Sequence, residues 1–294
     1  MTIFGVEFSP ERLQFILMMV LVVGVLLYVR ILRKYSKAPP SALGSDAPTE
    51  AMSASELERY ARHIVLREIG GAGQTKLRNA RVLVVGVGGL GSPVLQYLAA
   101  AGVGTLGFVD DDVVGLSNLQ RQVLFNENHL DMPKVFAAEA QLKALNPFIV
   151  LRPYNRKFDA DLLSDYDLVL DGTDNFATRQ AVNAACVATK TPLIFGAIAQ
   201  WEGQVGGYDP TGSTPCYACV FPDEPKDGLA PSCAQAGVMG ALPGVIGSLM
   251  ATEAIKVITG AGDPLAGSMI LYDALSSQTR KISTPKDANC KVCA

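Results

Sequence analysis

Histidine and tryptophan are scarce in this sequence. Its 294 residues include two histidines, His63 and His129, and one tryptophan. Neither histidine stands at the spacing of a metal ligand, so a site built on paired histidines is excluded. The net charge is −3, the pI is near 5.5, and no run of lysine or arginine occurs outside the N-terminal region. Nucleic acid is therefore not an expected partner, because binding to a phosphate backbone needs a basic surface.

Apolar residues are abundant: 49% of the chain is hydrophobic and 18% is charged. A chain of this length and composition can bury a full hydrophobic core. The first long apolar run, Leu13 to Leu32 with Arg30 at its end, would span about 30 Å as a helix, which matches a bilayer core. A cleaved signal peptide and a buried core helix are the alternatives. We expect an uncleaved anchor because no small-residue cleavage site ends the run.

The basic residues that follow this run predict that the downstream chain lies on the cytoplasmic side of an inner membrane. The expected organisation is a short tail over 1–12, a transmembrane helix over 13–32, a linker over 33–52 and one domain over 53–294. Proline, glycine and small residues are typical of such a linker.

A strand, a glycine-rich loop, a helix and a second strand occupy the stretch from Arg81 to Val109. Val82 to Val85 is an apolar run typical of a strand buried on both faces, and a helix is expected to begin near Ser92 and Pro93. Asp110 ends the second strand, where an acid can accept a hydrogen bond from a ribose hydroxyl. This pattern predicts a nucleotide site and leaves open a dinucleotide or a mononucleotide. The loop glycines are Gly86, Gly88, Gly89 and Gly91.

Helical and strand patterns then alternate, which is typical of an α/β, Rossmann-like, doubly wound and mostly parallel sheet. Helices are expected over about 133–145, 177–189 and 245–258, the last one capped by Gly260. Further strands are expected over 149–151, 167–170 and 193–195, followed by a short polar-apolar strand over 204–208 and late, antiparallel strands over 269–272 and 279–282. Gly86, Asp110 and Asp174 all follow strand ends, so they are expected to meet in one crevice.

Before the glycine loop, Ser53 and Glu56 form a capping box that predicts a helix ended by Gly70 and Gly71. Arg62 lies near the helix's polar side, which by itself indicates a solvated face.

Four of the six cysteines form two C-x-x-C pairs. Two such pairs provide the four thiolates of a closed structural zinc site, whereas a redox dithiol or disulfides are the alternative. Cys186 falls in an apolar helix and is expected in the core. Cys233 falls in a loop-like segment, where an inert thiol is the plain interpretation. The expected zinc ligands are Cys216, Cys219, Cys290 and Cys293.

The order of several motifs resembles that of the MoeB/ThiF family of adenylyltransferases, the bacterial relatives of ubiquitin-activating enzymes. The resemblance runs from about Ser53 to Cys293. Its motifs are RYARHIVLREIG, GVGGLG, SNLQRQ, Pro133 with Lys134, DGTDN, EGQ, both C-x-x-C pairs and CAQAGV.

Such a resemblance implies ATP and Mg2+ as cofactors beside the structural zinc. It also implies a homodimer that adenylylates the C-terminal Gly-Gly carboxylate of a ubiquitin-fold sulfur-carrier protein and releases pyrophosphate. By position, Arg62 is similar to an arginine that reaches the partner's triphosphate, and Arg121, Lys134 and Asp174 are similar to catalytic residues. The implied nucleotide-binding residues are Gly88, Gly89, Gly91, Asp110, Ser117, Asn118, Leu119, Gln120, Arg121, Lys134, Asp174 and Asn175.

Cys233 matches the position at which some family members form a thioester or acyl-disulfide with the carrier, while other members need no such thiol. The membrane segment is outside the usual family pattern, and no rhodanese domain follows, so a separate sulfur donor is expected. An NAD-dependent oxidoreductase and a non-catalytic membrane adaptor of the same fold are the competing functions. Motifs alone leave the pathway open between molybdopterin, thiamine and other sulfur carriers.

Overall fold

The protein is described from a computed structural model that covers residues 2–3, 6–7, 19, 24, 51–211, 214–224 and 236–294. The chain divides into two units, Met1–Ala42 and Leu43–Ala294. In the first unit, β1 (Thr2–Ile3) and β2 (Val6–Glu7) pair antiparallel. Apart from residues 19 and 24, the predicted membrane segment 13–32 lies outside the described residues, as does the predicted linker up to residue 50.

In the second unit, eight described strands form one sheet in the order β10-β9-β8-β7-β6-β3-β4-β5. Neighbouring strands from β5 to β7 run parallel, and β8, β9 and β10 add antiparallel ladders at one edge. The expected mostly parallel sheet with late antiparallel strands is thereby confirmed. The strands are β3 (Arg81–Val85), β4 (Thr105–Val109), β5 (Val150–Tyr154), β6 (Leu168–Asp171), β7 (Leu193–Ala199), β8 (Glu202–Tyr208), β9 (Ser268–Asp273) and β10 (Gln278–Ser283).

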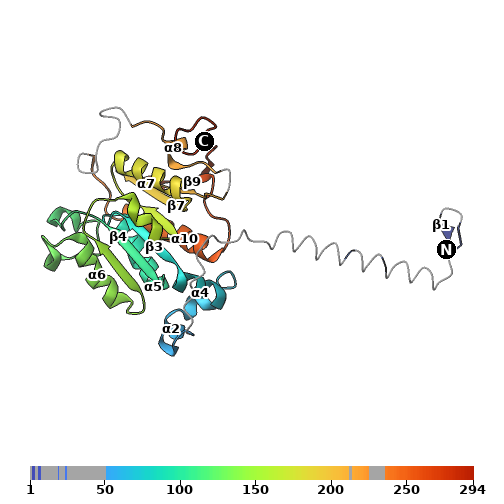
Figure 1. The fold of residues 1–294 in the computed structure, drawn as a ribbon, viewed down its shortest axis with the longest axis horizontal. Helices are drawn as coiled ribbons and strands as arrows, with labels where there is room; N and C mark the ends of the chain where they lie inside the picture. Colours follow the sequence, from blue (N-terminus) through green and yellow to red (C-terminus); the bar gives the residue numbers. More distant parts are fainter. Residues whose placement is uncertain are drawn as a thin grey trace. The chain divides into compact units, whose positions relative to one another are not determined.

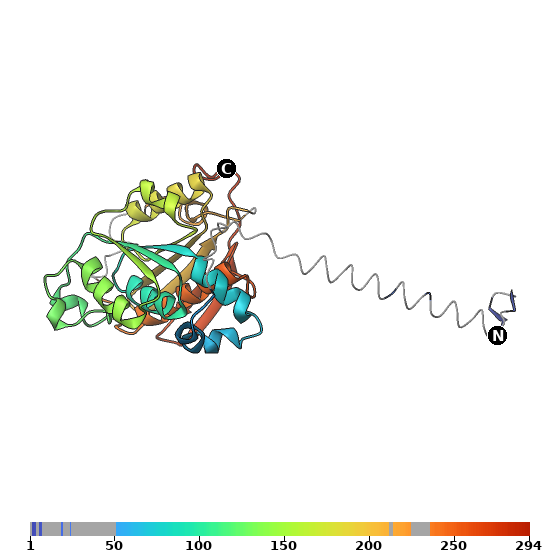
Figure 2. The same ribbon diagram turned by 60° about the horizontal axis from the view of Figure 1, so that its bottom comes forward.

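Both faces of the central strand β3 are buried, as its apolar run predicts. Val82 and Val84 belong to the core beneath α5 (Gly91–Ala101), α6 (Lys134–Leu145) and α10 (Leu242–Thr259). Leu83 and Val85 belong to a second core beneath α7 (Phe176–Thr189). Because successive side chains of a strand point to opposite faces, the run needs a helix layer on each side. Figures 1 and 2 show the sheet between these two layers.

On length and hydropathy alone, α10 is the one helix within the described residues that could cross a membrane. More than half of it is buried inside the domain, where it packs on α5, α4 (Gly70–Asn79) and β7. Its features are therefore those of a core helix. Gly260 ends it with a φ of 78°, which confirms the predicted cap.

The N-terminal helices differ from the single helix predicted before the glycine loop. The capping box is present, since the backbone N–H of Ser53 donates to Glu56 and that of Glu56 donates to the Ser53 hydroxyl. However, α2 (Ala54–Arg59) and α3 (Ala61–Ile64) are short, and Gly70 begins α4 instead of ending a helix. Gly70 has a φ of 61°, a conformation that lets the chain turn there at little cost.

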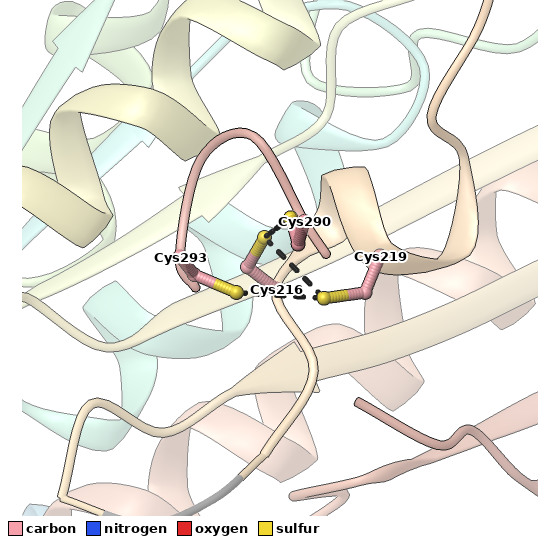
Figure 3. Close-up of side chains that lie close together, drawn as sticks. All are labelled: Cys216, Cys219, Cys290 and Cys293. Atoms are coloured by element: carbon pink, nitrogen blue, oxygen red, sulfur yellow. Dashed lines mark hydrogen bonds between the residues drawn. The ribbon is translucent and has the colours of Figure 1, made fainter. Parts of the chain in front are cut away.

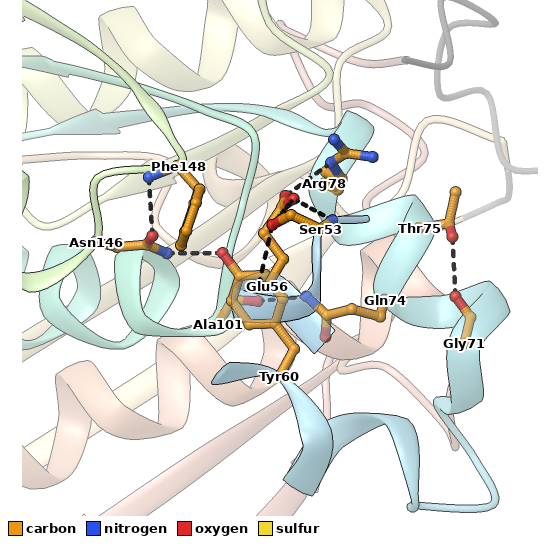
Figure 4. A network of polar contacts seen from close by, with 10 residues as sticks. All are labelled: Ser53, Glu56, Tyr60, Gly71, Gln74, Thr75, Arg78, Ala101, Asn146 and Phe148. Carbon is orange, nitrogen blue, oxygen red and sulfur yellow. Dashed lines mark hydrogen bonds and ion pairs between the residues drawn. The ribbon is translucent and has the colours of Figure 1, made fainter. Parts of the chain in front are cut away.

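Polar contacts tie these helices to the sheet domain (Figure 4). The Gln74 side chain donates to the Ala101 carbonyl at 2.8 Å, and the Asn146 side chain donates to the Tyr60 hydroxyl at 2.9 Å. Tyr60, Gln74 and Asn146 are all buried, so these bonds satisfy groups that water cannot reach.

Strand order reverses between β3 and β6, because the chain moves outward from β3 to β4 and β5 and then returns to β6. In open α/β sheets, ligands bind at the carboxyl ends of the strands beside such a reversal. The glycine loop follows β3, Asp110 follows β4, and the DGTDN loop follows β6. The fold therefore brings the three predicted strand ends to one edge of the sheet.

Candidate active site

Backbone contact accounts for two of the glycines in the loop after β3. A Cβ on Gly91 would lie 1.9 Å from the carbonyl oxygen of Gly86, and a Cβ on Gly86 would lie 3.3 Å from the backbone of Gly172. Gly172 belongs to the DGTDN motif, so the loops after β3 and β6 touch. The backbone N–H groups of Gly88 and Gly89 have no hydrogen-bond partner within the described part of the chain. They remain available to an anion at the start of α5.

Asp110 is bonded directly to the glycine loop. Its carboxylate accepts from the backbone N–H of Val87 at 2.7 Å and from that of Asp112 at 2.9 Å. Burial raises the pKa of the Asp110 carboxyl, although the charge of Lys134 and these two N–H donors act in the opposite direction. Each carboxylate oxygen has a second lone pair, so Asp110 can still accept from a ribose hydroxyl.

The SNLQRQ segment lies beside the glycine loop. Ser117 and Asn118 lie in a short 3-10 helix, Leu116–Asn118, in which the Asn118 side chain accepts from the N–H of Gly115 at 3.1 Å. The guanidinium of Arg121 donates to the carbonyl of Ser117 at 3.0 Å. The Cγ of Arg121 lies 4.0 Å from the position of a Cβ on Gly89. Arg121 is therefore beside the loop that it was predicted to serve.

Leu119 and Gln120 of this segment contact other parts of the domain. Leu119 packs against the main core, and the Gln120 side chain donates to the carbonyl of Val238 at 3.2 Å. Gln120 thereby joins the segment to the chain that leads into α10.

Lys134 is the first residue of α6 and is buried, with 5% of its surface exposed. Its ammonium lies 2.7 Å from the carboxylate of Asp112. This pair differs from an ordinary surface ion pair, because its cation is shielded from water and faces the Asp110 region.

Asp174 and Asn175 play different local roles. The Asn175 side chain caps α7 by accepting from the N–H of Thr178 at 2.8 Å. Asp174 is exposed and forms no hydrogen bond or ion pair with another described residue. Its carboxylate is thus free for the predicted magnesium ion, whereas the Asn175 side chain already has a structural partner.

Three polar residues near the site were missed by the sequence interpretation. Asp171, the first residue of DGTDN, is buried and accepts from the N–H and the hydroxyl of Thr173. Arg179 donates to the carbonyl of Thr173 from the first turns of α7. Gln122 is buried beside Gly88, and its side-chain oxygen has no hydrogen-bond partner among the described residues. Asp171 and Gln122 stood within quoted motifs, but only the fold shows that they point inward.

One predicted residue lies on a different part of the domain. Arg62 is exposed on α3, which packs on α2 and α4. Its predicted role needs a second subunit. Cys233 lies outside the described residues.

The two C-x-x-C pairs meet, although 74 residues separate them. All four sulfur atoms lie within 4.8 Å of one another, with individual separations of 3.4, 3.7 and 3.9 Å (Figure 3). A tetrahedral zinc ion with bonds of about 2.3 Å places its sulfurs about 3.8 Å apart. These separations are much longer than a disulfide bond, so the four cysteines are free thiols in this structure and their arrangement is compatible with zinc. Its members are Cys216, Cys219, Cys290 and Cys293.

The pKa shifts within this cluster oppose one another, because burial raises the pKa of the Cys216 and Cys293 thiols. Burial opposes ionisation of Cys290, but N–H donors from Val292 and Cys293 outweigh it and lower the Cys290 pKa to about 7. The buried Asn183 of α7 donates to the sulfur of Cys216 and accepts from the N–H of Tyr217 at 2.9 Å. Cys186 is buried in the core, as expected, and burial strongly raises its pKa.

Curated relatives are similar to this chain in sequence, and solved structures are similar to it in fold. The chain is 49% identical over 246 residues to a sulfur carrier protein adenylyltransferase of Thermus thermophilus, covering 81% of this chain and 91% of the relative. It is 44% identical to the molybdopterin-synthase adenylyltransferase of Escherichia coli, covering 82% of this chain and 98% of that protein. It is 46% identical to MoeZ of Mycobacterium tuberculosis, a probable adenylyltransferase/sulfurtransferase, but spans only 63% of its length.

Among solved structures, E. coli MccB with ATP matches with a TM-score of 0.70 at 26% identity, covering 84% of this chain and 76% of MccB. The ThiF family model matches residues 60–292, a range that contains the glycine loop, the three strand ends and three of the four clustered cysteines. On that match and these identities, the chain belongs to the ThiF family.

Proposed function

We propose that the protein is an adenylyltransferase that uses ATP to adenylylate the C-terminal Gly-Gly carboxylate of a ubiquitin-fold sulfur-carrier protein. One observation carries this proposal: Asp110, Arg121 and Lys134 gather around a glycine loop at the sheet reversal, in a chain 49% identical to a sulfur carrier protein adenylyltransferase. An oxidoreductase would leave the cationic residues and the cysteine cluster without a role.

In this reaction, a carboxylate oxygen of the carrier attacks the α-phosphorus of ATP, and the bond from that phosphorus to pyrophosphate breaks. Both reactants are anions, so the site must neutralise the triphosphate and hold the reactants in line. Arg121 and Lys134 supply positive charge, and free loop N–H groups can bind phosphate oxygens. Asp174 would hold Mg2+, which neutralises phosphate charge when it is bound.

ATP–pyrophosphate exchange in the presence of the carrier tests this assignment. Arg121→Ala, Lys134→Ala and Asp174→Ala are each expected to lower exchange by about 10²–10³-fold. Lys143→Ala is the matched control, since Lys143 is an exposed lysine on the same helix as Lys134. Exchange at the wild-type rate in all three variants would refute the site.

The name of one relative, a molybdopterin-synthase adenylyltransferase, supports a carrier of the molybdopterin pathway, and a thiamine or other sulfur carrier is the alternative. Incubation of the enzyme with ATP and each candidate carrier distinguishes them. The carrier that is used gains the mass of an AMP group at its C-terminus.

Sulfur transfer follows adenylylation and uses a donor separate from the described domain. In one route the Cys233 thiol attacks the acyl-adenylate, forms a thioester and releases AMP. A Cys233→Ala variant that forms acyl-adenylate normally but fails in sulfur transfer supports this route, and normal sulfur transfer excludes it.

Residues 13–32 anchor the protein in the inner membrane in this proposal, with the catalytic domain in the cytoplasm. The uncharged run and its basic flank support the anchor. The full-length protein is expected to stay in the membrane fraction after an alkaline wash, whereas a chain that starts at Ala51 is expected to be soluble and active. Recovery of the full-length protein in the soluble fraction would remove the anchor from the proposal.

A further inference from the structure

Lys134 occupies an unfavourable place for a cation. Its ammonium is buried, and it belongs to the first residue of α6, where the positive end of the helix dipole lies. Burial and the dipole both oppose a positive charge at this position. An anion must therefore hold the ammonium in place before any nucleotide arrives.

Asp112 is the anion in direct contact. Its carboxylate lies 2.7 Å from the Lys134 ammonium, and its carbonyl accepts from the backbone N–H of Lys134 at 3.0 Å. The N–H of Asp112 donates to Asp110 at 2.9 Å, and Asp110 in turn accepts from the glycine loop. Asp112 thus connects Lys134 to the loop through a continuous series of hydrogen bonds.

The two partners of this pair differ in their exposure. The Lys134 side chain is 6% exposed, whereas the Asp112 side chain is 69% exposed. A carboxylate would repel a triphosphate, so Asp112 is unsuited to bind the nucleotide itself. A lysine ammonium has three N–H donors and can keep one on Asp112 while it presents the others to phosphate oxygens.

We propose that Asp112 is a positioning residue that holds the Lys134 ammonium toward the triphosphate and acts on ATP only through Lys134. This role rests on the proposed use of Lys134 as a phosphate ligand. It gives a function to an acid that none of the expected motifs assigned.

Thermal stability of the nucleotide-free protein tests the pairing without reference to function. Asp112→Asn leaves a buried cation without its contact anion, so the melting temperature is expected to fall by several degrees. Lys134→Met leaves only an exposed carboxylate and is expected to cost little. The Asp112→Asn/Lys134→Met double variant is expected to have the same melting temperature as the Lys134→Met single variant. A loss that persists in the double variant would overturn the pairing.

Calorimetry with magnesium-ATP tests the positioning. Asp112→Asn is expected to weaken binding by about tenfold, Asp112→Glu to recover most of the affinity, and Asp112→Asn to have no further effect in the Lys134→Met background. Asp111→Asn is the matched control, because it removes the same charge from the same acidic cluster without touching Lys134. Equal losses in both backgrounds, or tighter binding by Asp112→Asn, would overturn the inference. Absence of binding by the wild type would instead refute the proposed function.

Discussion

The need for glycine differs between positions of the glycine loop, because neighbouring backbone segments approach some positions more closely than others. Gly91 and Gly88 stand in the same loop, but their surroundings differ. A Cβ on Gly91 would overlap the Gly86 carbonyl, whereas a Cβ on Gly88 would find its nearest neighbour, the Gln122 side-chain nitrogen, at 3.6 Å. The first contact is with rigid backbone and the second is an ordinary van der Waals contact. Only the first glycine is required by the fold itself.

Gly91→Ala is therefore expected to lower the free energy of unfolding by about 1–3 kcal/mol, because the loop must move to relieve the overlap. Gly88→Ala is expected to leave the stability within about 0.5 kcal/mol of the wild type. Urea unfolding of the domain measures both. Equal stability of the two variants would show that the loop adapts more freely than the structure indicates.

The contribution of the Asp171 carboxyl to stability depends on pH. Burial raises the pKa of its carboxyl above the usual range, and the opposing effects of Arg179 and the Thr173 donors do not cancel this. Below the unfolded pKa, near 3.8, the group is protonated in both states and has no effect on the pH dependence. As pH rises from there to the folded pKa, only the unfolded chain releases its proton, so the folded protein loses stability.

Asp171→Asn is expected to remove this loss. The stability of the variant relative to the wild type should rise with pH above about 4 and level off once the wild-type carboxyl is ionised in the folded state. Urea unfolding of both proteins between pH 4 and pH 8 measures the difference. A difference that stays constant, or that falls with pH, would contradict the raised pKa.

At the scale of elements, α7 connects the nucleotide edge of the sheet to the cysteine cluster. Its N-terminus follows Asp174, and Arg179 in its early turns donates to the carbonyl of Thr173. Further along the same helix, Asn183 contacts Cys216 and Tyr217. The helix thus meets both sites, and its middle depends on bonds to the segment that carries the first C-x-x-C pair.

Asn183→Ala is expected to weaken zinc binding by about 10–100-fold, because it removes the donor to the Cys216 sulfur. Gln180→Ala is the matched control: Gln180 also bonds from α7 to this segment, at the Phe221 carbonyl, but does not touch a sulfur. Competition with a chromogenic chelator measures the affinity. If both variants lost zinc equally, general loosening of α7 would explain the effect. If wild-type protein contained no zinc and a chelator left its melting unchanged, the metal assignment would be wrong.

At the scale of the whole molecule, the homodimer that the family resemblance implies would complete a site that one chain leaves without Arg62. Arg62 is exposed on α3, so it is available to a neighbouring subunit. Each site would then take Lys134 from one subunit and Arg62 from the other, so Arg62→Ala and Lys134→Ala would remove contributions from different subunits.

Mixing the two inactive variants, after exchange of subunits, is expected to restore about a quarter of the wild-type exchange activity, because half of the dimers would contain one intact site of two. Each variant alone should stay inactive. No recovery despite confirmed mixed dimers would show that Arg62 serves the site of its own chain or none.

Much of the fold followed from local patterns. The apolar run at Val82 to Val85 indicated a strand buried on both faces, and Gly260 marked the end of α10, because burial and backbone conformation restrict residue choice within a few positions. The prediction that Gly70 ends a helix was wrong, because a glycine that permits a turn can precede a helix as readily as it can end one.

The sequence by itself determined the α/β alternation, the glycine loop, the two cysteine pairs and the resemblance to the family. Only the tertiary structure decided which groups meet. It brings Asp112 to Lys134 and Asn183 to Cys216, and it gathers the four sulfurs of two C-x-x-C pairs that lie 74 residues apart in the sequence. Periodicity reports which face of its own element a residue occupies. It does not report which distant side chain packs against that face, because that depends on how helices and strands are arranged around the completed sheet.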